Sequence, residues 1–166
     1  MRERSRAFRA TFHALGLSGT DRASDEHGGA GGSSAGRTYL TLTSIMRLLG
    51  HARRRIDFLK VDIEGFEWKA FLGADESAQR EGVFAECAAG SLRVDQLLIE
   101  LHADLHKTQV ATDFARAEHF FLGADRCGLK IFSKEANVYA CPAVWNCAGT
   151  IFEYSLVAPR SVQGGE

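Results

Sequence analysis

One stretch of this sequence constrains the fold more than any other, because an apolar run at residues 56–61 ends abruptly in carboxylates and a glycine. The run is rich in β-forming residues, and its length suits a buried strand rather than a helix. Asp62 and Glu64 follow it directly, and Gly65 marks the turn before the next element. The sequence therefore predicts a strand over residues 56–62 that brings acids to a sheet edge, where open parallel sheets bind ligands.

The rest of the chain alternates between strand and helix patterns. Residues 94–102 repeat the first pattern, since an apolar run again ends in polar residues, here Glu100 and His102. Further strands are predicted within residues 10–17, 129–133 and 151–157. Helices are predicted after a cap at Thr43 or Ser44, at residues 66–72 and at residues 112–127. The helical spacing of Phe114, Phe120 and Phe121 predicts that they pack in the core. This order predicts an α/β sandwich in which the two acid-ending strands are parallel neighbours.

The composition is that of one ordinary globular domain, with 45% hydrophobic and 25% charged residues in a chain of 166. The formal net charge of -1 gives no field that would draw the chain to nucleic acid. No apolar run approaches the roughly 18 residues of a membrane span. No signal peptide is recognisable either, so no membrane segment is expected and the cytoplasm is the default expectation.

The expected domain covers residues 10–158, between a basic segment at residues 1–9 and a tail at residues 159–166. Residues 21–37 are rich in Gly, Ser and charge, which predicts a flexible loop. No apolar strand precedes its glycines, so a phosphate-binding loop is not indicated. The four cysteines form no C-x-x-C pair; free thiols are favoured, and a disulfide between Cys141 and Cys147 is the alternative.

The polar residues at the two strand ends are the candidate site. Asp62 and Glu64 stand at positions i and i+2, so they face one way if the extended backbone continues past Asp62. Two carboxylates in one crevice make either a metal pocket or an acid–base pair. Glu100 and His102 have the same spacing. Structural readings remain open, because Glu64 or Glu67 can stabilise the start of the following helix and the second pair can hydrogen-bond to neighbouring loops.

Several blocks of the sequence resemble the FkbM-type, methyltransferase-like family. The central block is D-F-L-K-V-D-I-E-G-F-E-W at residues 57–68. The flanking blocks are F-H-A-L-G-L-S-G at residues 12–19, L-T-S-I at 42–45, L-L-I-E-L-H at 97–102, G-L-K-I-F-S-K-E-A-N at 128–137 and F-E-Y-S at 152–155. The resemblance implies a Rossmann-like methyltransferase sandwich, with a mostly parallel sheet and an antiparallel C-terminal strand.

The resemblance also implies an activity, which is methyl transfer from S-adenosylmethionine to an oxygen or nitrogen atom of a small-molecule or glycan acceptor. For a hydroxyl acceptor, such a protein supplies positioning and a base. The implied residues fall into three groups and include no metal ligand: catalytic Asp62, Glu64 and His102; cofactor-binding Leu17, Ser18 and Asp62; and substrate-binding Glu67, Glu100 and Asn137.

The resemblance does not extend to the N-terminal part of the family's domain. The glycine-rich cofactor loop after a first strand and the acid after a second strand have no counterpart in the sequence. The expectation is therefore a sheet that lacks its first two strands, as a truncated or incomplete catalytic domain. The alternatives are a catalytically inactive interaction domain and a two-metal nuclease, in which Asp62 and Glu64 form a D-x-E strand that binds Mg²⁺.

Overall fold

The computed structural model describes residues 10–23, 38–73, 81–102, 114–137 and 151–159, which form two sheets and four helices within those ranges. The larger sheet has four strands in the order β4-β5-β7-β6. Its strands are β4 (Leu59–Val61), β5 (Gln96–His102), β7 (Ile151–Val157) and β6 (Lys130–Ala136). Three helices pack with it: α2 (Glu67–Leu72), α3 (Gly82–Ala88) and α4 (Phe114–Arg126).

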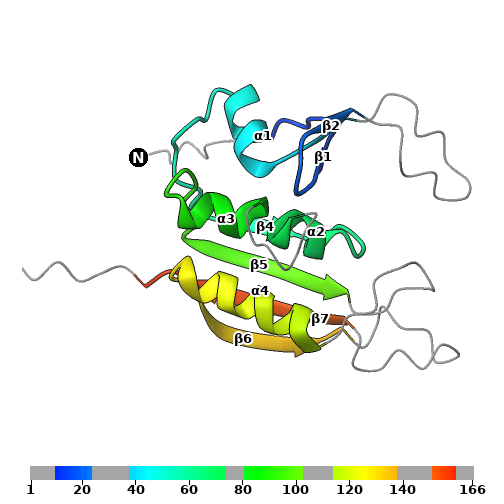
Figure 1. The fold of residues 1–166 in the computed structure, drawn as a ribbon, viewed down its shortest axis with the longest axis vertical. Coiled ribbons are helices and arrows are strands. Elements are labelled where there is room, and N and C mark those ends of the chain that lie inside the picture. Colours follow the sequence, from blue (N-terminus) through cyan, green and yellow to red (C-terminus); the bar gives the residue numbers. More distant parts are fainter. Residues whose placement is uncertain (1–9, 24–37, 74–80, 103–113, 138–150, 160–166) are drawn as a thin grey trace, which may run out of the picture.

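The four-stranded sheet is mixed in direction. β4 and β5 are parallel, as predicted for the two acid-ending strands, and β7 runs antiparallel to both β5 and β6. The C-terminal strand β7 is thus inserted between β5 and β6 (Figure 1). It pairs with β5 over seven residues, from Gln96 opposite Val157 to His102 opposite Ile151. The predicted α/β class is confirmed, and the sheet is mixed because two of its three strand pairings are antiparallel.

The core lies between this sheet and its helices. Alternate residues of β5, namely Leu97, Ile99 and Leu101, are buried in it. Phe120 of α4 is fully buried at its centre, with the rings of Trp68 and Phe71 from α2 and of Phe84 from α3 at centroid distances of 5.7, 5.6 and 5.0 Å. The core position predicted for Phe120 is confirmed. This packing fixes α2, whose first turn carries the site.

A second, smaller sheet lies on the N-terminal side of the chain. Its strands are β1 (Leu15–Leu17), β3 (Thr38–Leu40) and β2 (Arg22–Ala23), in the order β1-β3-β2, and α1 (Leu42–Leu48) follows β3. Figure 1 shows this unit on the opposite side of α2 and α3 from β5. Gly19 approaches the end of α2 so closely that a side chain there would collide with the carbonyl oxygen of Lys69. The segment that follows β1 therefore contacts α2 at its C-terminal end.

Several predicted boundaries need correction. The cap of α1 is Thr41 rather than Thr43 or Ser44, because Thr41 is extended and its hydroxyl accepts a hydrogen bond from the N–H of Ser44 at 3.2 Å. The strand predicted at residues 56–62 is only three residues long, with an isolated bridge from Ile56 to Val94. β6 extends beyond residue 133 to Ala136, and α3, β2 and β3 were not predicted.

Other predictions lie partly or wholly outside the described residues. This holds for Cys141 and Cys147 and for most of the predicted loop at residues 21–37, whose described beginning contains β2. Cys87 and Cys127 are described and are free thiols. Within the described ranges, no helix is long and apolar enough to cross a membrane.

Candidate functional site

The turn after β4 positions the first acids of the site. The strand ends at Val61, and the backbone turns at once, with left-handed φ angles of 58° at Glu64 and 95° at Gly65. Glycine adopts this conformation freely, but a residue such as Glu64 does so at a cost, so neighbouring contacts must hold it. The extended geometry needed to align Asp62 with Glu64 stops here. The D-x-E strand required by the nuclease alternative is therefore not formed.

Glu67 stabilises this turn from the first position of α2. Its side chain is fully buried, and its two oxygens accept hydrogen bonds from the N–H groups of Ile63 at 2.8 Å and Gly65 at 2.9 Å. Two backbone donors that the turn would otherwise leave unpaired are thereby satisfied. Glu67 thus stabilises the backbone turn that precedes its helix.

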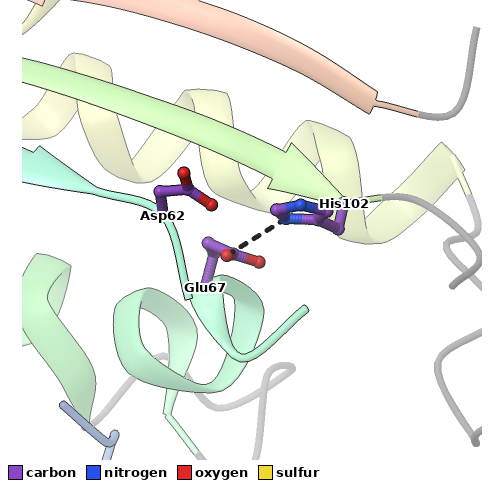
Figure 2. Close-up of side chains that lie close together, drawn as sticks. All are labelled: Asp62, Glu67 and His102. Carbon is purple, nitrogen blue, oxygen red and sulfur yellow. Dashed lines mark hydrogen bonds and ion pairs between the residues drawn. The ribbon is translucent and has the colours of Figure 1, made fainter. Parts of the chain in front are cut away.

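The same carboxylate contacts His102, the last residue of β5. The Nδ1 atom of His102 lies 3.2 Å from Oε1 of Glu67, and Figure 2 shows the two side chains meeting between the end of β5 and the start of α2. Trp68 donates its indole N–H to the backbone carbonyl of His102 at 2.8 Å. Both the ring and the backbone of His102 are therefore fixed by consecutive residues of α2.

The other ring nitrogen of His102 faces two more carboxylates. Its Nε2 atom lies 3.6 Å from Oε2 of Glu64 and 3.6 Å from Oε1 of Glu100. Glu100 is buried on β5, and its Oε1 accepts a hydrogen bond at 2.9 Å from the side-chain amide of Asn137, just beyond β6. Glu64 is 80% exposed, so the site opens to solvent on that side.

The protonation of His102 reflects these neighbours. Burial by itself disfavours the charged imidazolium and lowers the pKa of His102. The hydrogen bond to Glu67 and the negative charges of the surrounding glutamates outweigh burial, and the pKa of His102 is raised above its ordinary value. The pocket around the ring therefore favours positive charge.

Asp62, just after the end of β4, lies close to both Glu67 and His102. One of its oxygens, one of Glu67 and one ring nitrogen of His102 all lie within 4.8 Å of one another (Figure 2). The Asp62 side chain is 40% exposed and lies 3.9 Å from the amine of Lys60. It is thus accessible to a ligand while it borders a buried pair.

Most of the predicted site residues gather in one place. We call this group the carboxylate–histidine cluster; it consists of Asp62, Glu64, Glu67, Glu100, His102 and Asn137. The cluster holds carboxylates on several sides of one imidazole, so it can bind a cation, accept a proton or receive hydrogen bonds from a polar ligand.

Two predicted cofactor residues lie elsewhere. Leu17 and Ser18 precede Gly19, which packs against the C-terminal end of α2, whereas Asp62 lies beside its N-terminal end. α2 has six residues, which span about 9 Å. Trp68, in contrast, was not predicted to support the site. An aromatic residue with a polar N–H directly after Glu67 was the available signal, but the partner of that N–H lies 34 positions along the chain.

The chain matches a known protein family. The model of a family described as a methyltransferase domain matches residues 2–147, which is most of the chain. No curated protein matches the chain. No solved structure matches it either.

Proposed function

This chain belongs to the methyltransferase-domain family, and on that premise we propose that it acts in methyl transfer from S-adenosylmethionine to an oxygen or nitrogen atom of a small-molecule or glycan acceptor. The observation that carries the proposal is an exposed carboxylate, Asp62, beside the buried pair of Glu67 and His102. A reactive acid held against a rigid support is what a positioned general base requires.

We also propose an FkbM-type family membership and a Rossmann-like fold. The FkbM type is supported by the K-V-D-I-E-G-F-E sequence, in which each acid has a distinct position in the cluster. A Rossmann-like arrangement is supported by the order β4, α2 and α3, β5, α4, β6, in which the three strands point the same way.

The charge of the cluster suits the cofactor, but two of the residues expected to bind the cofactor lie outside the cluster. S-adenosylmethionine supplies the methyl group from a positively charged sulfonium, and the accessible carboxylates of Asp62 and Glu64 provide a negative surface suited to a cation. Leu17 and Ser18 lie at the other end of α2, so only Asp62 of the three expected cofactor residues borders the cluster.

Different residues of the cluster have different roles in the proposed reaction. Asp62 accepts the proton that the acceptor hydroxyl or amine loses as the new bond to carbon forms. Glu67 and His102 keep the turn and the end of β5 in place, and the exposed Glu64 bounds the acceptor side. Glu100 and Asn137 present a hydrogen-bonded carboxylate and amide that can receive polar groups of an acceptor.

Turnover tests this proposal. The full chain would be incubated with S-adenosylmethionine and a panel of hydroxyl and amine acceptors that includes glycans, and release of S-adenosylhomocysteine would be measured. Removing a general base is expected to lower kcat by about 100-fold or more, so Asp62→Asn should do so. The matched control is Asp57→Asn, because Asp57 is 82% exposed, pairs with Arg55 and precedes the same strand. Full turnover by Asp62→Asn, or no turnover by the wild type with any acceptor, would refute the proposal.

A further inference from the structure

We propose that Cys87 and Cys127 are a redox-sensitive thiol pair, which a hydroperoxide converts into a disulfide that links α3 to α4. Cys87 lies near the end of α3, and Cys127 directly follows α4. Both are free thiols in this structure, and both are partly exposed. This inference does not depend on methyl transfer, since the state of the thiols can be measured with neither methyl donor nor acceptor.

The two helices approach each other closely one turn before the thiols. Gly123 of α4 lies so near α3 that a side chain there would collide with the ring of Phe84. Cys87 follows Phe84 by three positions and Cys127 follows Gly123 by four, so each thiol lies on the side of its helix that makes this contact. The N–H of Cys127 donates to the carbonyl of Gly123 at 3.2 Å, so the helical turn continues to the cysteine.

The two thiols contact each other beside this close approach. They share a side-chain hydrogen bond, and Sγ of Cys127 also lies 3.9 Å from the carbonyl oxygen of Phe84. A disulfide forms only where two backbones are already near each other, because its bond lengths and angles are narrowly defined. Thiols in contact across two closely packed helices meet this requirement.

Both cysteines also lie beside helix ends that have room to adjust. Gly90 follows the end of α3 and Gly128 follows Cys127, with left-handed φ angles of 71° and 74°. A side-chain atom added at either glycine would meet nothing within 4 Å. The small shift that joins two sulfurs can therefore be taken up at these ends, without a change in the buried parts of the helices.

The hydrogen bond between the thiols gives them different roles. The S–H of Cys127 stabilises a thiolate at Cys87, and the pKa of Cys87 is lowered below its ordinary value. The same hydrogen bond, together with burial, raises the pKa of Cys127. Cys87 is therefore the thiol that ionises first and attacks the oxidant, and Cys127 is the thiol that completes the disulfide.

The oxidation takes two steps. The Cys87 thiolate attacks one oxygen of the hydroperoxide; an S–O bond forms, the O–O bond breaks, and the leaving oxygen takes up the proton that Cys87 lost, which leaves a sulfenic acid. The sulfur of Cys127 then attacks the sulfur of Cys87; an S–S bond forms, the S–O bond breaks, and hydroxide leaves with the Cys127 proton as water. With hydrogen peroxide, two thiols and one peroxide give one disulfide and two water molecules.

The new bond would link two helices that meet at the centre of the core. The ring of Phe84 on α3 lies 5.2 Å from that of Phe71 on α2 and 5.0 Å from that of Phe120 on α4, between centroids. A link between α3 and α4 beside these rings restricts the unfolded chain and thereby stabilises the folded one. Oxidation should therefore make the protein more resistant to heat, and reduction should reverse the gain.

The test is a peptide map of the full chain, which is reduced, freed from reductant and treated with hydrogen peroxide. Remaining thiols are alkylated, the protein is digested without reduction, and linked peptides are identified by mass spectrometry. We expect Cys87 linked to Cys127. The melting temperature should rise by about 5 °C or more on oxidation and return to its first value with dithiothreitol.

Single variants, with folding checked by circular dichroism, separate the two roles. Cys127→Ser should leave a sulfenic acid at Cys87, which dimedone labels. Cys87→Ser should leave Cys127 unlabelled, because the Cys127 thiol is not the one that attacks the peroxide. The matched control is Cys141→Ser, which removes a cysteine outside the pair and should form the link as the wild type does.

Three results would overturn the proposal. The first is alkylation of both Cys87 and Cys127 after peroxide treatment of the wild type. The second is a link from Cys87 to Cys141 or Cys147 in place of Cys127. The third is dimedone labelling of Cys127 in Cys87→Ser with no labelling of Cys87 in Cys127→Ser. Failure of methyl transfer with an intact link would refute only the proposed function.

Discussion

Two carboxylates in this molecule accept hydrogen bonds of similar geometry in very different surroundings. Glu67, at the edge of the four-stranded sheet, accepts from two backbone N–H groups at 2.8 and 2.9 Å and is fully buried. Asp21, in the N-terminal unit, accepts from the N–H of Thr41 at 2.7 Å and from the hydroxyl of Ser44 at 2.6 Å, but is exposed. Because a buried group that loses its partner cannot turn to water instead, we expect the loss of Glu67 to cost more stability than the loss of Asp21.

The largest effect is expected at Glu67. Glu67→Ala removes the partner of His102 and leaves the N–H groups of Ile63 and Gly65 without their acceptor. Breaking a buried charged pair costs about 3–5 kcal/mol of unfolding free energy. Urea denaturation followed by circular dichroism would measure it. The control is Glu118→Ala on the exposed side of α4, which should stay within about 0.5 kcal/mol of the wild type. Equal effects of the two variants would contradict the role given to burial.

A smaller loss is expected at Trp68. Trp68→Phe keeps an aromatic ring beside Phe120 but removes the indole N–H that binds the carbonyl of His102 at 2.8 Å. A buried acceptor left unpaired costs about 1–3 kcal/mol. Thermal and urea unfolding would report the change. An unchanged free energy of unfolding would mean that the end of β5 is held without this hydrogen bond.

The helix cap of the N-terminal unit comes next. Thr41→Ala removes the hydroxyl that accepts from the N–H of Ser44 at the start of α1 and should cost about 1 kcal/mol. Thr41→Ser, which retains the hydroxyl, is the control and should recover most of the loss. Hydrogen exchange of the α1 amides would separate the two variants. Equal protection in both would show that the cap does not stabilise this helix.

A smaller effect is expected from Asp21→Ala in the N-terminal unit. Loss of two hydrogen bonds at an exposed carboxylate should cost less than about 1 kcal/mol, well below the loss at Glu67. Asp21→Asn retains one acceptor oxygen and should cost less still. A loss of unfolding free energy at Asp21 equal to that at Glu67 would contradict the larger effect expected for the buried acid. Urea denaturation at neutral pH is the measurement.

The pH dependence of the Asp21 effect follows from its contacts. The hydroxyl of Ser44 and the backbone N–H of Thr41 favour the ionised carboxylate, so the pKa of Asp21 is lowered from 3.8 in the folded protein. The group therefore stabilises the fold above pH 3.8, and this contribution is lost as the pH falls through the lower folded-state pKa. The difference in unfolding free energy between wild type and Asp21→Ala should shrink over that acid range. A difference that grows there would contradict the assignment.

The sequence predicted the elements whose signals are local. An apolar run ending in acids located β5 and the end of β4, and the spacing of aromatic residues located α4 and its buried Phe120. α3 was not predicted because it is only seven residues long and begins with glycine; contacts of Phe84 with Phe71 and Phe120 hold it against the core. Local preference was overridden by packing in that case.

The residues of the candidate site could be predicted from local sequence, but their arrangement could not. The residues at the strand ends were predictable, because acids after an apolar strand are unusual unless they have partners. Their arrangement was not. The left-handed backbone at Glu64 depends on the support of Glu67, and the burial of Glu100 and His102 depends on pairing with β7 some 50 positions later in the chain. Long-range contacts of this kind leave no local pattern.

The position of the bound cofactor in solution is the most direct test of the role proposed for the carboxylate–histidine cluster. A ¹H–¹⁵N NMR titration of the full chain with S-adenosylmethionine would compare the cluster with the N-terminal unit, using the amides of Asp62, Gly65 and His102 on one side and those of Leu17 and Ser18 on the other. We expect saturable shifts centred on the first group, and their loss in Asp62→Asn. Shifts confined to Leu17 and Ser18, or no shifts at all, would contradict it.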